Sequence, residues 1–177
     1  MACDELSRAC QKVGRFLHDF ALVEQEINEG IAAILKLEGY AADVVVNSIP
    51  FFNKANLFGT IALGTAPDDE KEGIKTLFNK IADENQNRVL MAHSRFEPAK
   101  DEAVQFWRTV AKDRELKTQD QVWSKQKFEQ ASKRLKKIKD KLAKLKPTLT
   151  FEISEEGTRI LTHYLYEPGS RWVPLED

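Results

Sequence analysis

Residues 125–146 read KQKFEQASKRLKKIKDKLAKLK, and this stretch decides the fold class. Its apolar residues are spaced 3, 4, 3, 4 and 3 positions apart: Phe128, Ala131, Leu135, Ile138, Leu142 and Leu145. That spacing lines them along one side of an α-helix, which Pro147 would end. Three heptads are short for a coiled coil between two chains, so the stripe favours packing within the protein's own helical bundle.

The same stretch carries an uneven share of the charge. It holds ten basic and two acidic residues, a net charge of +8, whereas the other residues of the 177-residue chain hold 17 basic and 26 acidic ones, a net charge of −9. Two interpretations stay open. The helix could present a basic ridge to phosphate groups of a nucleic acid, or it could be a solvated face that acidic neighbours balance.

The remaining sequence predicts further helices at about 4–38, 41–48, from Pro50 onward, and 68–93, because apolar residues recur there at helical spacing. A β-hairpin insert is expected at about 100–118, where Val104 and Phe106 alternate with polar residues and 112–114 form a turn. A second hairpin is expected in 147–177. We therefore predict a mainly α fold, a bundle over 1–146 with one or two small β-hairpins, in which 147–177 extends the same domain.

Several classes of protein are disfavoured by composition. Cys3 and Cys10 form no CxxC pair and lie near no histidine, so neither a disulfide nor a metal site is expected, and no cofactor motif is present. The first ten residues lack the features of a signal peptide, and no apolar run reaches membrane-spanning length. A cytoplasmic protein without membrane contact is the expectation.

One pair of residues suggests chemistry. Arg88 and His93 lie in Asn87-Arg88-Val89-Leu90-Met91-Ala92-His93-Ser94, at the expected end of the 68–93 helix. An imidazole near a guanidinium suits phosphodiester cleavage. Side chains five positions apart diverge by about 140° on an ideal helix, so they converge only where the helix loosens or where a second copy faces the first. The alternative is that Arg88 makes a surface ion pair and His93 caps the helix.

This arrangement resembles the HEPN superfamily, whose signature is Arg-x4–6-His late in a helical bundle. The similarity covers residues 12–145: a first helix with Val23-Glu24, a second with Lys54-x-x-Leu57, the Asn-Arg-x4-His-Ser stretch, a hairpin-like insert and a long amphipathic helix. The resemblance implies a HEPN-like bundle that forms a homodimer, RNA as the substrate and an antitoxin-type protein as a possible partner.

The resemblance further implies a metal-independent endoribonuclease with a composite active site at the dimer interface. By position, His93 would be the general acid or base, Arg88 would stabilise charge on phosphorus, and Asn87 and Ser94 would support them. This chain has Val89 where many members have a polar residue. Candidate RNA contacts, chosen for their charge, are Arg95, Lys133, Arg134 and Lys137. The alternatives are a non-catalytic HEPN-like dimerisation or interaction module and an unrelated helical adaptor that docks through its basic helix.

Glu24 is the last candidate. It lies between Phe20 and Ile27, where the apolar stripe of the first helix expects a nonpolar residue. A carboxylate in that position needs a partner. One hypothesis is that Glu24 faces the 68–93 helix and pairs with Arg88 or His93, and the other is that it reaches water at the rim of the core.

Overall fold

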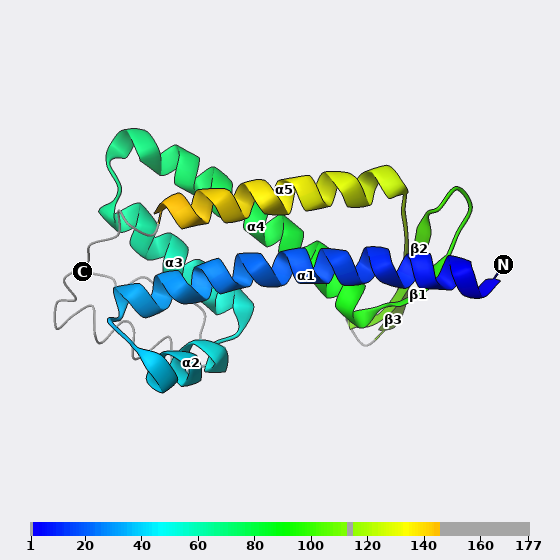
Figure 1. Cartoon of the computed structure of the whole chain (residues 1–177), viewed down its shortest axis with the longest axis horizontal. Helices are drawn as coiled ribbons and strands as arrows, with labels where there is room; N and C mark the ends of the chain where they lie inside the picture. Colours follow the sequence, from blue (N-terminus) through cyan, green and yellow to red (C-terminus); the bar gives the residue numbers. More distant parts are fainter. Residues whose placement is uncertain (1, 113–114, 146–177) are drawn as a thin grey trace.

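The computed structural model describes residues 2–112 and 115–145, and over these ranges it contains five helices and a three-stranded sheet (Figure 1). In chain order the elements are α1 (Ala2–Ile34), α2 (Gly39–Ser48), α3 (Phe51–Thr65), α4 (Asp68–His93), β1 (Arg95–Pro98), β2 (Val104–Lys112), β3 (Glu115–Trp123) and α5 (Lys125–Leu145). The prediction of a mainly helical fold is confirmed. The predicted hairpin in 147–177 lies outside the described residues.

The long helices α1, α4 and α5 form the body of the molecule (Figure 1). α1 and α5 run in the same direction and pack against each other, whereas α4 runs the opposite way and contacts both. α3 fills the space beside α1 and α4, and α2 lies at the end of the bundle away from the N-terminus. The sheet occupies the other end and returns the chain from the end of α4 to the start of α5.

The core lies where the apolar stripes of α1 and α5 meet. Every third or fourth residue of α1 from Ala9 to Ile34 is buried, which includes Phe16, Phe20 and Ile27. The stripe predicted for α5 is buried from Phe128 to Leu142. The prediction that this helix packs into the protein's own bundle is therefore confirmed for the described residues.

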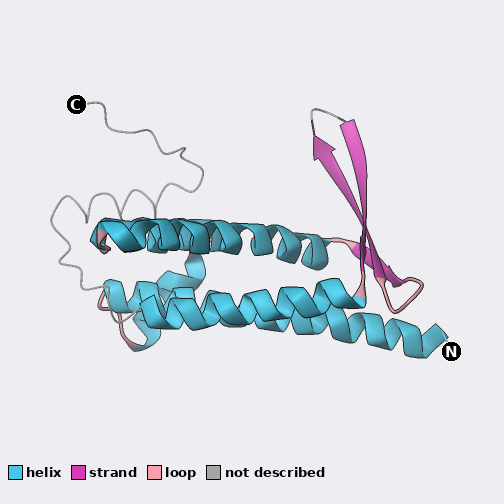
Figure 2. Ribbon diagram, turned by 90° about the horizontal axis from the view of Figure 1, so that it is seen from above, coloured by secondary structure: helices cyan, strands magenta, loops and turns pink. Residues whose placement is uncertain are grey.

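The insert between α4 and α5 is a three-stranded antiparallel sheet in the order β1-β2-β3. It spans 95–123 and extends beyond the predicted hairpin at 100–118. The sequence pattern did not indicate β1 or the end of β3, because β1 is short and β3 is mostly polar. The expected turn at 112–114 includes residues outside the described ranges. The β2–β3 ribbon projects beyond the helices (Figure 2).

An aromatic cluster joins the sheet to the bundle. Trp123, at the end of β3, is fully buried and packs against Phe16 of α1 at 5.8 Å, Phe106 of β2 at 6.5 Å and Phe128 of α5 at 5.2 Å between ring centroids. Edge-on and tilted aromatic pairs of this kind add stability beyond their buried area. The root of the sheet is therefore part of the core, although its outer end is not.

Most helix limits agree with the expectations, and the end of the first helix differs. α4 has the predicted limits, and α2 begins two residues before the predicted 41. α1 ends at Ile34 rather than near residue 38, because Lys36 adopts a left-handed conformation with φ 52°. Gly39 begins α2 with φ 54°, a value that glycine adopts without strain.

Two glycines allow α3 to approach its neighbours closely. A Cβ atom added to Gly30 of α1 would lie 2.7 Å from the fully buried ring of Phe58, and one added to Gly59 of α3 would lie 3.1 Å from Phe78. Phe58 and Phe78 are themselves in edge-on contact at 5.9 Å. The α1–α3–α4 junction therefore depends on small residues opposite large rings.

Gly30→Ala should destabilise the protein by about 1–3 kcal/mol, because the buried ring of Phe58 has to move. The control is Gly14→Ala in the same helix, where a Cβ atom meets nothing within 4 Å. That variant should gain up to about 1 kcal/mol from the higher helix propensity of alanine. Urea unfolding measures both free energies, and equal stabilisation of the two variants would contradict the packing argument.

Candidate nucleic-acid interface

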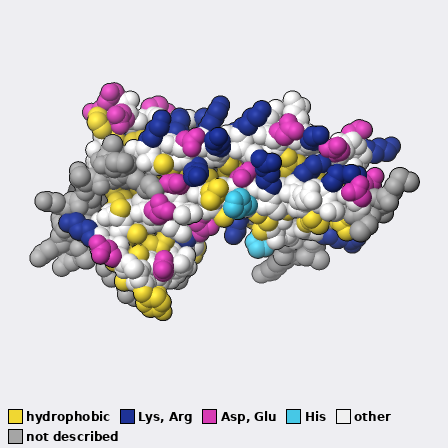
Figure 3. Space-filling model, viewed as in Figure 1, with side chains coloured by type: hydrophobic (Ala, Val, Ile, Leu, Met, Phe, Trp, Pro, Cys, Tyr) yellow, Lys and Arg dark blue, Asp and Glu magenta, His cyan; other side chains and the backbone are white. Residues whose placement is uncertain are grey.

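The outer face of α5 is a row of lysines. The apolar stripe fixes one side of this helix against α1, so the opposite side points to solvent. Five exposed lysines lie in an arc of about 140° on that outer side, and we call them the basic ridge: Lys133, Lys136, Lys137, Lys141 and Lys144. Figure 3 shows basic side chains gathered along α5, with only scattered acidic ones between them.

The basic ridge is not neutralised by ion pairs. In α5 the paired cations are Lys125, 3.1 Å from Glu102, and Arg134, which bonds Glu84. The ridge lysines form no ion pair among the residues that the structure describes, although two acidic residues of α5, Glu129 and Asp140, lie on the same side of the helix. The ridge thus keeps a positive charge available to an anionic partner.

The Lys125–Glu102 pair belongs to the loop that leads into β2. The pKa of the Glu102 carboxyl is lowered by its hydrogen bond and charge interaction with Lys125, and further by Lys12 of α1. Lys12 also donates a 2.6 Å hydrogen bond to the backbone carbonyl oxygen of Glu102. These contacts attach the loop to α1 and α5, so Lys125 serves the fold rather than the ridge.

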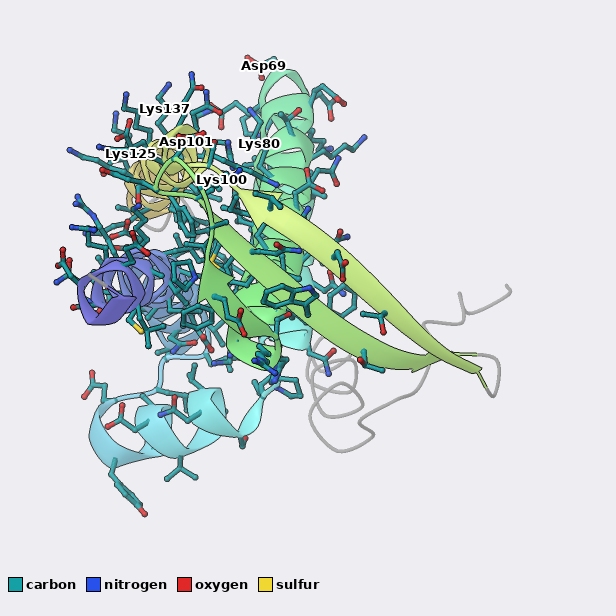
Figure 4. All side chains as sticks on the ribbon, turned by 90° about the vertical axis from the view of Figure 1, so that its right-hand side faces the viewer. Asp69, Lys80, Lys100, Asp101, Lys125 and Lys137 are labelled. Carbon is teal, nitrogen blue, oxygen red and sulfur yellow. The ribbon has the colours of Figure 1, made fainter. Side chains whose placement is uncertain are left out.

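Among the grooves beside the basic ridge, one at the end of α5 is lined by Lys141 and Lys144 with Asp69 and Glu70 of α4. Two others lie nearer the middle of the helix. One lies between α1 and α5, has a volume of about 360 Å³, and is lined by Arg15, Asp19, Ser132, Lys133 and Lys136 among others. The other lies between α4 and α5, has a volume of about 470 Å³, and includes Lys80, Asn87, Lys137 and Lys141. Figure 4 shows Lys80 and Lys137 on the side of the molecule where α4 and α5 lie. Cations from two helices therefore line the α4/α5 groove.

Glu84 holds α4 to α5 beneath that groove. Its side chain is 4% exposed, accepts a hydrogen bond from Arg134 Nε, and accepts a second from Asn87 Nδ2 at 3.0 Å. A buried carboxylate is stable only with such partners. Asn87 and Arg134, both predicted as site residues, therefore have a structural contact in common that the sequence analysis did not anticipate.

The pairing predicted for Glu24 is wrong. Glu24 Oε1 accepts a 2.6 Å hydrogen bond from Lys54 Nζ on α3, and Asn28 accepts another from the same ammonium at 3.0 Å. The Lys54 side chain is 3% exposed and the Glu24 side chain 29% exposed. α3 lies against this part of α1, so the carboxylate meets Lys54 instead of Arg88 or His93.

Arg88 and His93 do not converge within one chain. α4 continues without a break from Asp68 to His93, so the two residues leave it about 140° apart. Arg88 is half-buried and His93 is exposed. Neither side chain makes a hydrogen bond or an ion pair with a described residue. The surface ion pair considered for Arg88 is therefore absent from the described part of the chain.

The two residues that follow His93 differ from each other. Ser94 is the C-cap of α4, and its Oγ atom is buried without a hydrogen-bond partner among the described atoms. Arg95 begins β1 and pairs with Glu97 on the same strand at 2.5 Å. Ser94 therefore follows His93 in the chain without a hydrogen bond to it, whereas Arg95 has its own carboxylate partner.

Neither the buried Glu84 nor the ion pair of Lys54 was predicted from the sequence. A signal existed for Glu84, because Leu77, Ile81, Glu84 and Met91 occupy one helical stripe in which Glu84 is the polar exception. Lys54 is likewise a polar residue at a core position, because it lies between the aromatic residues that start α3 and the buried Ala55. Both positions are polar residues at core spacing, as Glu24 is.

Glu24→Gln should lower the free energy of unfolding by about 2–3 kcal/mol, because the Lys54 ammonium stays buried without its charged partner. Adding Lys54→Met should recover most of the loss. The control is Glu129→Gln on α5, an exposed residue whose change should cost less than about 0.5 kcal/mol. Chemical denaturation of the three variants tests the pair, and a double variant no more stable than Glu24→Gln would refute it.

No family model, curated protein or solved structure matches this chain. The helices that the structure describes include none with the length and apolarity needed to cross a membrane. The described residues also contain no group of three or more His, Cys, Asp or Glu side chains placed to hold a metal ion.

Proposed function

We propose that this chain is an RNA-binding protein that contacts the phosphate backbone through the basic ridge of α5. The observation that carries the proposal is the set of five exposed lysines without ion pairs in the described part of the chain. A solvated helix face that is balanced internally would have its lysines near carboxylates. Several carboxylates of α1 and α4 pair instead with other cations, as Asp68 does with Lys71 and Asp4 with Arg8. Asp19 and Asp83 line the grooves beside the ridge but form no ion pair with its lysines in the described part of the chain.

Phosphate binding by such a ridge depends on salt. Each Lys–phosphate contact releases condensed counterions, so the logarithm of the binding constant falls with the logarithm of salt concentration by about 0.7 per contact for a single strand. The ridge provides charge without aromatic side chains between the lysines. It therefore supplies affinity, and base recognition has to come from another surface.

Lys136→Gln, Lys137→Gln and Lys141→Gln together should weaken binding of a fluorescein-labelled single-stranded RNA at least tenfold and reduce the salt slope by about 2. The matched control carries Lys71→Gln, Lys75→Gln and Lys100→Gln, the same change in net charge away from the ridge. Fluorescence anisotropy over a KCl series measures affinity and slope. Equal effects of the two triple variants would contradict a specific ridge.

A second proposed activity is cleavage of the bound RNA by a homodimer. It is favoured by the half-buried Arg88, which has no carboxylate partner in the described residues, and by the exposed His93 at the end of the same helix. Since the two side chains diverge on one helix, Arg88 of one copy would act with His93 of the other. His93 would accept the 2′-hydroxyl proton while the 2′-oxygen attacks phosphorus and the 5′-oxygen leaves.

His93→Ala should reduce cleavage of RNA in EDTA by about 10²–10⁴-fold, because general acid–base catalysis contributes that much. His18→Ala, an exposed histidine of α1, is the control and should cleave like the wild type. Products are separated on a denaturing gel. Equal cleavage by the wild type and His93→Ala, or none by either, would leave a non-catalytic RNA-binding or interaction module.

A further inference from the structure

A groove with a different chemistry lies at the other side of α4, against the β2–β3 ribbon. Its volume is about 690 Å³, within the range of ligand-binding sites. Four of its polar side chains are amides: Asn85, Gln86, Asn87 and Gln121. Arg108 and Asp120 of the ribbon complete the polar lining, and the half-buried Val89 and Leu90 provide an apolar surface. We call it the amide groove.

Two of these amides are held in a defined orientation. Asn87 donates its Nδ2 to Glu84, a carboxylate that can only accept. Gln121 accepts with its Oε1, at 3.0 Å, from the indole N–H of Trp123, which can only donate. These partners leave Asn87 Oδ1 and Gln121 Nε2 without a hydrogen bond among the described residues. One acceptor and one donor are therefore positioned in advance, and such preorganisation lowers the entropic cost of binding.

The amide groove adjoins the α4/α5 groove. Asn87 lines both the amide groove and the α4/α5 groove that contains Lys80, Lys137 and Lys141. Near the start of α5, Lys127 lies over the Trp123 ring, 4.3 Å from its centroid. Burial and the charge of Arg134 lower the pKa of the Lys127 ammonium. Arg134 bonds Glu84, whereas Lys127 interacts with that carboxylate only through its charge.

We propose that the amide groove receives unpaired bases of a single-stranded RNA whose phosphates lie in the adjoining α4/α5 groove, with Asn85, Gln86, Asn87 and Gln121 contacting base edges. This inference rests on the proposed RNA-binding function and adds its specificity. Side-chain amides offer a donor and an acceptor side by side, as base edges do. Val89 and Leu90 contact the base face, and the Arg108 guanidinium stacks on a base or donates hydrogen bonds to its edge.

The chemistry favours single strands over duplexes. In a duplex the Watson–Crick edges are paired and the faces are stacked, so a protein contacts mainly the phosphates and the 2′-hydroxyls of the minor groove. The basic ridge contacts both forms, but the amide groove contacts only unpaired bases. The wild type is therefore expected to bind a 12-nucleotide single-stranded RNA at least tenfold more tightly than the same sequence as a duplex.

Asn85→Ala with Gln86→Ala tests the groove without changing charge. Neither side chain makes a hydrogen bond among the described residues, so the fold should be unaffected, and a circular-dichroism melt checks this. Affinity for the single strand should fall about tenfold, with the salt slope and duplex affinity unchanged. The matched control is Asn79→Ala with Gln11→Ala, two exposed amides outside both grooves, which should bind like the wild type.

The ridge triple variant separates this inference from the proposed function. If that variant loses affinity and Asn85→Ala with Gln86→Ala does not, or loses single-strand and duplex affinity alike, the amide groove is not a base site although RNA binding stands. If the wild type binds neither RNA, both proposals are wrong. A 4-thiouridine-containing single strand, photocrosslinked to the wild type, should attach to residues 85–90 or 118–121. Crosslinks confined to other peptides would overturn the proposal that the amide groove binds bases.

Discussion

The structure depends on the contact between the apolar stripes of α1 and α5. A helix as basic as α5 gains nothing from burial except along its single row of Phe128, Ala131, Leu135, Ile138 and Leu142, and α1 presents the complementary row. The stabilising free energy of hydrophobic burial is proportional to the apolar area removed from water. Burying this one row of side chains therefore fixes the rotation of α5 about its axis. Because the seam is narrow, the lysines on the opposite side of α5 are exposed to solvent. The fold thereby creates the basic ridge as a consequence of packing.

Polar side chains further restrict how the helices pack against one another. Lys54 with Glu24 joins α3 to α1, and Glu84 with Arg134 joins α5 to α4. Buried pairs of this kind add little net stability, but losing one partner is costly. Each pair therefore selects one arrangement of neighbouring helices among those that hydrophobic contact alone would permit. The Glu84 pair has a second effect, because it orients Asn87 where the cationic and amide grooves meet.

The proposed RNA path follows from the two different surfaces on either side of α4. On one side this helix faces the lysines of α5, and on the other it faces the polar residues of the β2–β3 ribbon. Phosphates and unpaired bases need these two kinds of surface, adjacent to each other. The aromatic cluster around Trp123 keeps the root of the ribbon in the core and thus holds Gln121 and Arg108 opposite α4. Arg88 and His93 lie on the same helix, where a second copy could complete a cleavage site.

The sequence by itself determined the helices whose apolar spacing is regular and whose ends carry proline or acidic residues, so α4 and the buried face of α5 have the predicted positions. It also determined the separation of charge, since a stripe of apolar residues leaves lysines only the outer side. Local patterns predicted a hairpin that ends at about residue 118, so they missed β1 and the second half of β3. β1 is four residues long, and β3 is rich in polar side chains that only pairing with β2 makes extended. Only the tertiary structure decided that Glu24 meets Lys54, that Asn87 turns to Glu84, and that Arg88 and His93 stay apart on an unbroken helix. Partners of this kind are distant in sequence, and they are selected by which helix faces lie together after the core has packed.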